Sequence, residues 1–138
     1  MTISAHDVAA ALIERQLEAA RPIDKLQLQK LLYLVQGVHS ACWGAPAFRE
    51  PIHAYRNGPV VRVVEETYRN ATGGMTPLSD PMGGHPERLP FETADTVETV
   101  LRHFGSWTGP NLEAYTKRPG SPGGRSAATS LPASSPTS

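Results

Sequence analysis

The sequence is poor in several features that mark particular classes of protein. Its single cysteine, Cys42, cannot form an internal disulfide, which favours a reducing compartment. No apolar run approaches the roughly 20 residues that a membrane-spanning helix needs. The chain does not open with a basic segment, an apolar stretch and a small-residue cleavage site, the features of an export signal. We therefore expect a cytoplasmic protein that has no membrane partner.

Net positive charge is also missing, because thirteen Lys and Arg balance thirteen Asp and Glu. Proteins that bind nucleic acid mainly by neutralising phosphates usually carry a basic stripe, so the composition disfavours this class. Direct DNA binding stays open as an alternative, since two helices joined by a short turn are expected over 4–43. The candidate reading helix, 25–43, has little polar surface for base contacts, which weakens that alternative.

Motifs for catalysis and for metal binding are absent. There is no G-x-S-x-G sequence, no Cys-His pair with an orienting carboxylate, and no glycine-rich phosphate loop with its Lys and Ser/Thr. Glu65 and Glu66 are neighbours on an expected helix and point about 100° apart, so they cannot act as a carboxylate pair. His39, Cys42 and His53 could approach one another, but no paired ligand spacing supports a zinc site. The sequence predicts no enzyme activity, no cofactor and no metal.

Five segments carry apolar residues at helical spacing. They cover about 4–20, 25–43, 59–69, 93–104 and 109–116. The 25–43 segment is apolar on most of its circumference, which is typical of a central helix packed by several partners. The β-branched valines of the third segment leave a strand open there as an alternative. The expected fold is mainly α, with about five helices around the central one and a short extended or hairpin element near 50–58.

Local sequence marks where the first two helices begin. Ser4 with Asp7, and Asp24 with Gln27, have the spacing of capping boxes. Gly44 is a natural stop for the second helix.

Two stretches have no hydrophobic period. Residues 70–92 are rich in Gly and Pro, and we interpret them as a mobile insert within a domain of residues 1–117. Residues 118–138 are almost entirely Pro, Gly, Ser, Thr and Ala, with Leu131 as the only large aliphatic residue. Such a composition cannot offset the entropy of ordering, so a disordered tail is predicted.

The run from Leu26 to Tyr68 contains three sub-motifs in order: L-x-L-Q-K-L-L-Y leading into Q-G-x-H, then G-x-P-x-F, then E-P-I-x-A-Y with G-P-V-V. The residues that carry them are Leu26, Leu28, Gln29, Lys30, Leu31, Leu32, Tyr33, Gln36, Gly37, His39, Gly44, Pro46, Phe48, Glu50, Pro51, Ile52, Ala54, Tyr55, Gly58, Pro59, Val60 and Val61. This order resembles the Panacea domain, the SocA-like antitoxin family. Near the end the chain departs from the family pattern, with Lys117 in place of a histidine and Gly123 in place of a tryptophan.

The resemblance implies an antitoxin-like binding module that neutralises a cognate toxin, encoded next to it, by direct protein–protein contact. One member of the family is an adaptor that presents its toxin to a bacterial protease, so a protease is a second implied partner. A DNA-binding autoregulator of a toxin–antitoxin operon and a degenerate, inactive copy are the alternatives.

We predict two groups of partner-binding residues. The first is an exposed edge of the central helix, and the second is a rigid tip in which a Tyr and an Arg, types common at binding hot spots, are fixed in shape by Gly and Pro. The residues are Tyr33, Gln36, His39, Tyr55, Arg56, Asn57, Gly58 and Pro59.

Overall fold

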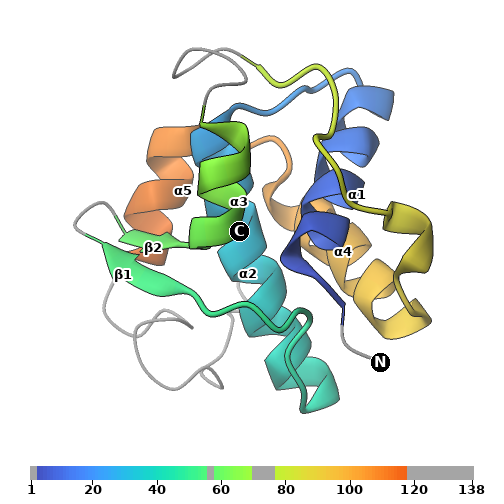
Figure 1. Cartoon of the computed structure of the whole chain (residues 1–138). Helices are drawn as coiled ribbons and strands as arrows, with labels where there is room; N and C mark the ends of the chain where they lie inside the picture. Colours follow the sequence, from blue (N-terminus) through green and yellow to red (C-terminus); the bar gives the residue numbers. More distant parts are fainter. Residues whose placement is uncertain (1–2, 56–57, 70–76, 118–138) are drawn as a thin grey trace.

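The computed structural model describes residues 3–55, 58–69 and 77–117 (Figure 1). The elements in chain order are α1 (Ala5–Glu18), α2 (Lys25–Trp43), β1 (His53–Tyr55), β2 (Gly58–Val60), α3 (Arg62–Tyr68), the short 3-10 helix η1 (Pro86–Arg88), α4 (Phe91–Phe104) and α5 (Gly109–Thr116). The expected fold class, mainly α with five helices and a short hairpin, is confirmed. Across the described ranges, no helix is both long and apolar enough to cross a membrane.

The helix α2 is the centre of the fold. It packs against α1, α3, α4, α5 and β2, and Figure 1 shows it between α5 on one side and α1 with α4 on the other. Four of its five leucines are almost completely buried: Leu28, Leu31, Leu32 and Leu34 are each at most 1% exposed. A helix that is apolar on most sides can bury them only if elements pack around it, which explains the central place.

Both predicted capping boxes are present. The Ser4 and Asp24 side chains each accept the backbone N–H three residues on, and the side chains of Asp7 and Gln27 accept the N-cap N–H in return. The helix α2 ends at Gly44, whose φ of 72° is left-handed.

The segment that precedes α3 differs from the expectation of a helix led by Pro59. Residues Gly58–Val60 form β2, which pairs antiparallel with β1 in the register His53↔Val60 and Tyr55↔Gly58. The helix begins only at Arg62. Pro59 has no N–H to donate, and the β-branched Val60 suits an extended backbone, so the alternative left open for these residues is the one observed.

The described part of the predicted insert, 77–92, makes specific contacts. Leu78 is 2% exposed, and its N–H donates to the Ile23 carbonyl at 2.8 Å. The Met82 N–H donates to the Tyr68 hydroxyl at 2.7 Å. A Cβ on Gly84 would lie 2.2 Å from the His6 carbonyl oxygen, so the chain passes directly against α1. These contacts join segments distant in sequence, and the mobility of the insert stays a prediction.

Candidate functional site: the arm between α2 and α3

The candidate site is the arm, which we define as residues 44–61. It leaves the end of α2, turns, and returns along the same helix to the hairpin of β1 and β2 (Figure 1). Strand β2 packs against α2 and α5, so β1 is the outer strand. Polar side chains of α2 reach the backbone of the arm at successive points along this return.

Gln36 holds the first part of the arm. Its Oε1 accepts from the Ala47 N–H at 2.7 Å and from the Phe48 N–H at 3.2 Å, and its Nε2 donates to the Phe48 carbonyl at 3.0 Å. Ala47 and Phe48 are 3% and 1% exposed. One side-chain amide therefore satisfies backbone groups of residues that water does not reach.

His39 holds the turn that starts the arm. Its Nδ1 lies 2.7 Å from the Ala45 carbonyl oxygen, and its Nε2 lies 3.0 Å from Thr93 Oγ1 on α4. A carbonyl oxygen can only accept, so Nδ1 carries a hydrogen and Nε2 is free to accept from the threonine hydroxyl. This buried histidine thus joins α2, the arm and α4.

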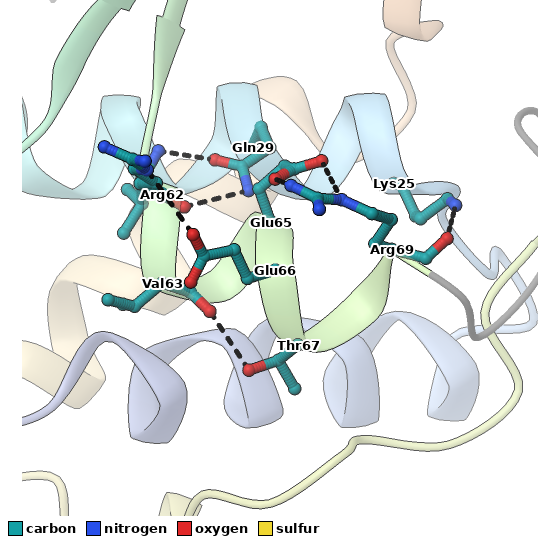
Figure 2. A network of polar contacts seen from close by, with 9 residues as sticks. Lys25, Gln29, Arg62, Val63, Glu65, Glu66, Thr67 and Arg69 are labelled. Carbon is teal, nitrogen blue, oxygen red and sulfur yellow. Dashed lines mark hydrogen bonds and ion pairs between the residues drawn. The ribbon is translucent and has the colours of Figure 1, made fainter.

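Gln29 holds the end of the arm. The Val61 N–H donates to Gln29 Oε1 at 2.8 Å, and Gln29 Nε2 donates to the Val61 carbonyl at 3.3 Å (Figure 2). The amide supplies one donor and one acceptor to a single residue, as a neighbouring strand would. Val61 is the N-cap of α3, so this pairing also fixes where α3 begins.

Lys30 is the most unusual of these side chains, because it is 1% exposed. Its Nζ donates to the Pro59 carbonyl at 3.0 Å. Burial holds the pKa of Lys30 below its ordinary value of 10.5; the charge of Glu113 opposes this shift and that of Lys117 adds to it. A Cβ on Gly58 would lie 3.0 Å from this Nζ, and the φ of Gly58 is +109°. The hairpin therefore needs glycine here both for its backbone angle and for the space that the ammonium group occupies.

Glu50 fastens the arm to α1. Its Oε1 accepts from the Ala5 N–H at 2.8 Å, and its Oε2 accepts from the Ser4 hydroxyl at 3.1 Å. The Arg49 N–H also donates to the Ile3 carbonyl at 3.1 Å. A carboxylate at the first turn of a helix is stabilised by the free N–H groups there. The arm is thus held by two helices.

The outer face of α3 continues from the arm and carries paired charges (Figure 2). Arg69 Nη2 lies 2.7 Å from Glu65 Oε1, and this hydrogen bond holds the pKa of Glu65 below its usual range. Arg62 and Glu66 form a second pair at 3.4 Å. Both pairs have i,i+4 spacing and stabilise the helix by only about 0.2–0.5 kcal/mol each.

The comparison with known proteins adds one finding to this geometry. The antitoxin SocA-like, Panacea domain family matches residues 28–122, more than half of the chain. The chain belongs to this family. No curated protein and no solved structure matches it. Membership supports an antitoxin role for this Panacea domain.

The α2 residues that hold the arm all fall within the matched range: Gln29, Lys30, Gln36 and His39. The helix α1, which receives Glu50, precedes that range. In this Panacea domain, the polar positions of the L-x-L-Q-K and Q-G-x-H sub-motifs therefore face the arm.

The predicted exposed edge of α2 is wrong for two of its three residues. Tyr33 is 4% exposed and His39 is 5% exposed, because α2 is surrounded by other elements on most sides. Gln36 is half-buried, and both its amide atoms are occupied by the arm. These side chains offer little area to a partner in this conformation. Contact between any of them and a partner stays a prediction.

The predicted tip is described only in part. The Tyr55 backbone belongs to β1, and Gly58 and Pro59 belong to β2. Gly58 is buried and Pro59 is half-buried. Arg56, Asn57 and the side chain of Tyr55 lie outside the described residues, so their part in binding also stays a prediction.

Three residues that hold the arm were not among the predicted site residues: Gln29, Lys30 and Glu50. A signal for two of them exists in the sequence, because Gln29 and Lys30 are polar residues between the leucines of a largely apolar helix. Glu50 gave no comparable signal, since its partner, the start of α1, is 45 residues away.

Metal binding has no support in the part of the chain that the structure describes. No group of three His, Cys, Asp or Glu side chains there is placed to hold an ion. His39 is occupied by Ala45 and Thr93, and Cys42 is exposed.

Proposed function

We propose that this Panacea domain neutralises a cognate toxin by direct protein–protein contact, with the hairpin of the arm as the contact surface. The observation that carries the proposal is that four side chains of α2 bind the backbone of the arm, and the Glu50 side chain of the arm binds the first backbone N–H of α1. A surface whose backbone is already fixed loses less conformational entropy on binding. The role is non-catalytic, because the proposed chemistry is contact alone.

The outward part of the hairpin supports this choice of surface. Strand β1 is the outer strand, and Ala54 on it is exposed, while His53 and Val60 form a half-buried cross-strand pair. We include Tyr55 and Arg56 in the contact because their residue types are frequent at binding hot spots. A toxin would then meet the paired strands of the hairpin together with the aromatic Tyr55 and the cationic Arg56.

One finer role, that of a proteolytic adaptor, is compatible with such contact. Delivery of the bound toxin to a protease would use the same surface, and it differs from simple neutralisation in that the toxin disappears. DNA binding through α2 is not favoured, because Gln29 and Lys30 of that helix are 7% and 1% exposed and cannot reach base edges.

The experiment is co-expression of this protein with the product of the adjacent gene. We expect that product to be toxic alone and harmless together with this protein. An immunoblot of the toxin then separates simple neutralisation from the adaptor role: its level stays constant if it is only blocked and falls if it is delivered to a protease. The variant Tyr55→Ala/Arg56→Ala should lose protection, whereas the control Glu14→Ala/Glu18→Ala, on the exposed side of α1, should keep it. Toxicity that this protein never relieves, for any neighbouring gene, would contradict the proposal.

A further inference from the structure

The C-terminal end of α2, next to the start of the arm, carries a pair of exposed aromatic side chains. Trp43, the last residue of α2, is 43% exposed, and Phe91, the first residue of α4, is 73% exposed. Their rings meet edge to face, with centroids 6.4 Å apart and planes at 81°. We call these two side chains the aromatic pair. Large aromatic residues gathered at the surface are typical of binding sites.

The indole of the aromatic pair is fixed in orientation. Trp43 Nε1 donates to Thr96 Oγ1 at 3.2 Å, and the hydrogen of that hydroxyl is directed to the Glu92 carbonyl at 2.8 Å. The ring therefore rests on α4 through a directed hydrogen bond as well as through its contact with Phe91. A tryptophan that is already held in place loses little freedom when a partner covers it.

Two carboxylates flank the aromatic pair. Asp95 lies one helical turn from Phe91, and Glu92 lies one turn from Thr96, so both share the face of α4 on which the indole rests. Both are exposed, and within the described ranges neither carboxylate has a hydrogen-bond or ion-pair partner. The nearest basic residue in sequence, Arg88, instead lines a hollow at the start of α1.

We propose that the aromatic pair and its two carboxylates bind an arginine-bearing apolar segment of a partner protein. A guanidinium can stack on the indole face and reach the carboxylates with its N–H groups, while an aliphatic neighbour covers Phe91. The site is separate from the hairpin, because Lys30, which contacts the hairpin, and Trp43 are about 20 Å apart along α2. The inference does not rest on the toxin being the partner.

The two tryptophans of the chain make a direct test possible. In a proton–nitrogen NMR titration of the full chain, the Trp43 indole signal reports this site, and the Trp107 indole signal is the internal control. The probe is acetyl-Leu-Arg-Leu-Leu-Arg-amide, and its matched control has glutamate in place of both arginines. We expect the arginine peptide to shift the Trp43 signal saturably, with the Trp107 signal unmoved and the glutamate peptide without effect.

Matched variants test the role of charge. Glu92→Lys/Asp95→Lys should weaken binding of the arginine peptide by roughly tenfold. Glu14→Lys/Glu18→Lys changes the net charge equally at exposed positions of α1 and should leave binding unchanged. Equal movement of both indole signals, no movement at millimolar peptide, or equal binding of both peptides would overturn the proposal. Because the assay uses no toxin, its result is independent of the neutralisation experiment.

Discussion

Replacement of Gln36 by methionine tests whether the arm is held by the side chain of this residue. Methionine keeps the length and volume of the side chain but removes all three hydrogen bonds to Ala47 and Phe48. Each such bond contributes about 0.5–1.5 kcal/mol net, and the N–H groups left behind are buried, so the free energy of unfolding should fall by about 2–4 kcal/mol. For a domain of this size we expect the melting temperature to fall by about 8–15 °C.

The assay is thermal unfolding followed by circular dichroism, together with amide hydrogen exchange of Ala47 and Phe48. Exchange at these two amides should accelerate more than exchange in the buried part of α2, because the loss is local to the arm. The control is Glu14→Met on the exposed side of α1, which should change stability by less than about 0.5 kcal/mol. A Gln36→Met protein with unaltered melting and unaltered exchange at both amides would refute the reasoning.

Three further predictions concern the other residues that hold the arm. Burial lowers the pKa of Lys30, so the folded state binds the proton of this ammonium group less tightly than the unfolded state does. The wild type should therefore gain stability relative to Lys30→Met as the pH rises toward 10.5. Urea unfolding of both proteins across that range measures the difference, and parallel pH curves would contradict it. Gly58→Ala should lower the free energy of unfolding by about 1–3 kcal/mol. The loss should exceed that of Gly83→Ala, because Gly83 also has a positive φ but a Cβ there would have no neighbour within 4 Å. Equal melting temperatures of the two variants would exclude a role for the Lys30 contact. Glu50→Ala should lower the free energy of unfolding by about 1.5–3 kcal/mol, and Glu50→Gln by less, because the amide can keep one hydrogen bond to α1. Chemical denaturation measures the stability of both variants. Equal losses would rule out the hydrogen bonds as the cause.

Local signals predicted much of the fold. The capping boxes at Ser4 and Asp24 and the stop at Gly44 depend on residues within one turn of each other, and all three are confirmed. The apolar circumference of 25–43 predicted a central helix because apolar surface on every side has to be covered.

Features that depend on distant contacts were harder to predict. Residues 58–60 suit either a helix or a strand, and the pairing with β1 together with the Gln29 contact decides for the strand. Helical spacing places Tyr33 and His39 on the surface of a helix but does not say which neighbours cover them. The contacts of 77–85 with α1 and with Tyr68 have no periodic signal at all.

For the candidate site, too, the local pattern could be predicted from the sequence and the distant contacts could not. The sequence located the stretch of chain, residues 26–61, from which both the arm and the residues that hold it come. It assigned Gln36 and His39 to a partner because a polar side chain on a helix looks the same whether it faces solvent or a returning backbone. Only the path of the arm along α2 distinguishes the two.

The central claim is that the arm presents a fixed hairpin to a toxin. The most direct measurement is the affinity of the purified complex with the neighbouring toxin, by calorimetry, for wild type and for Tyr55→Ala/Arg56→Ala. The account predicts a loss of more than about 1 kcal/mol for each residue, roughly thirtyfold together, at an unchanged melting temperature of the free protein. Affinity equal to that of the wild type would contradict the claim that the hairpin is the contact surface.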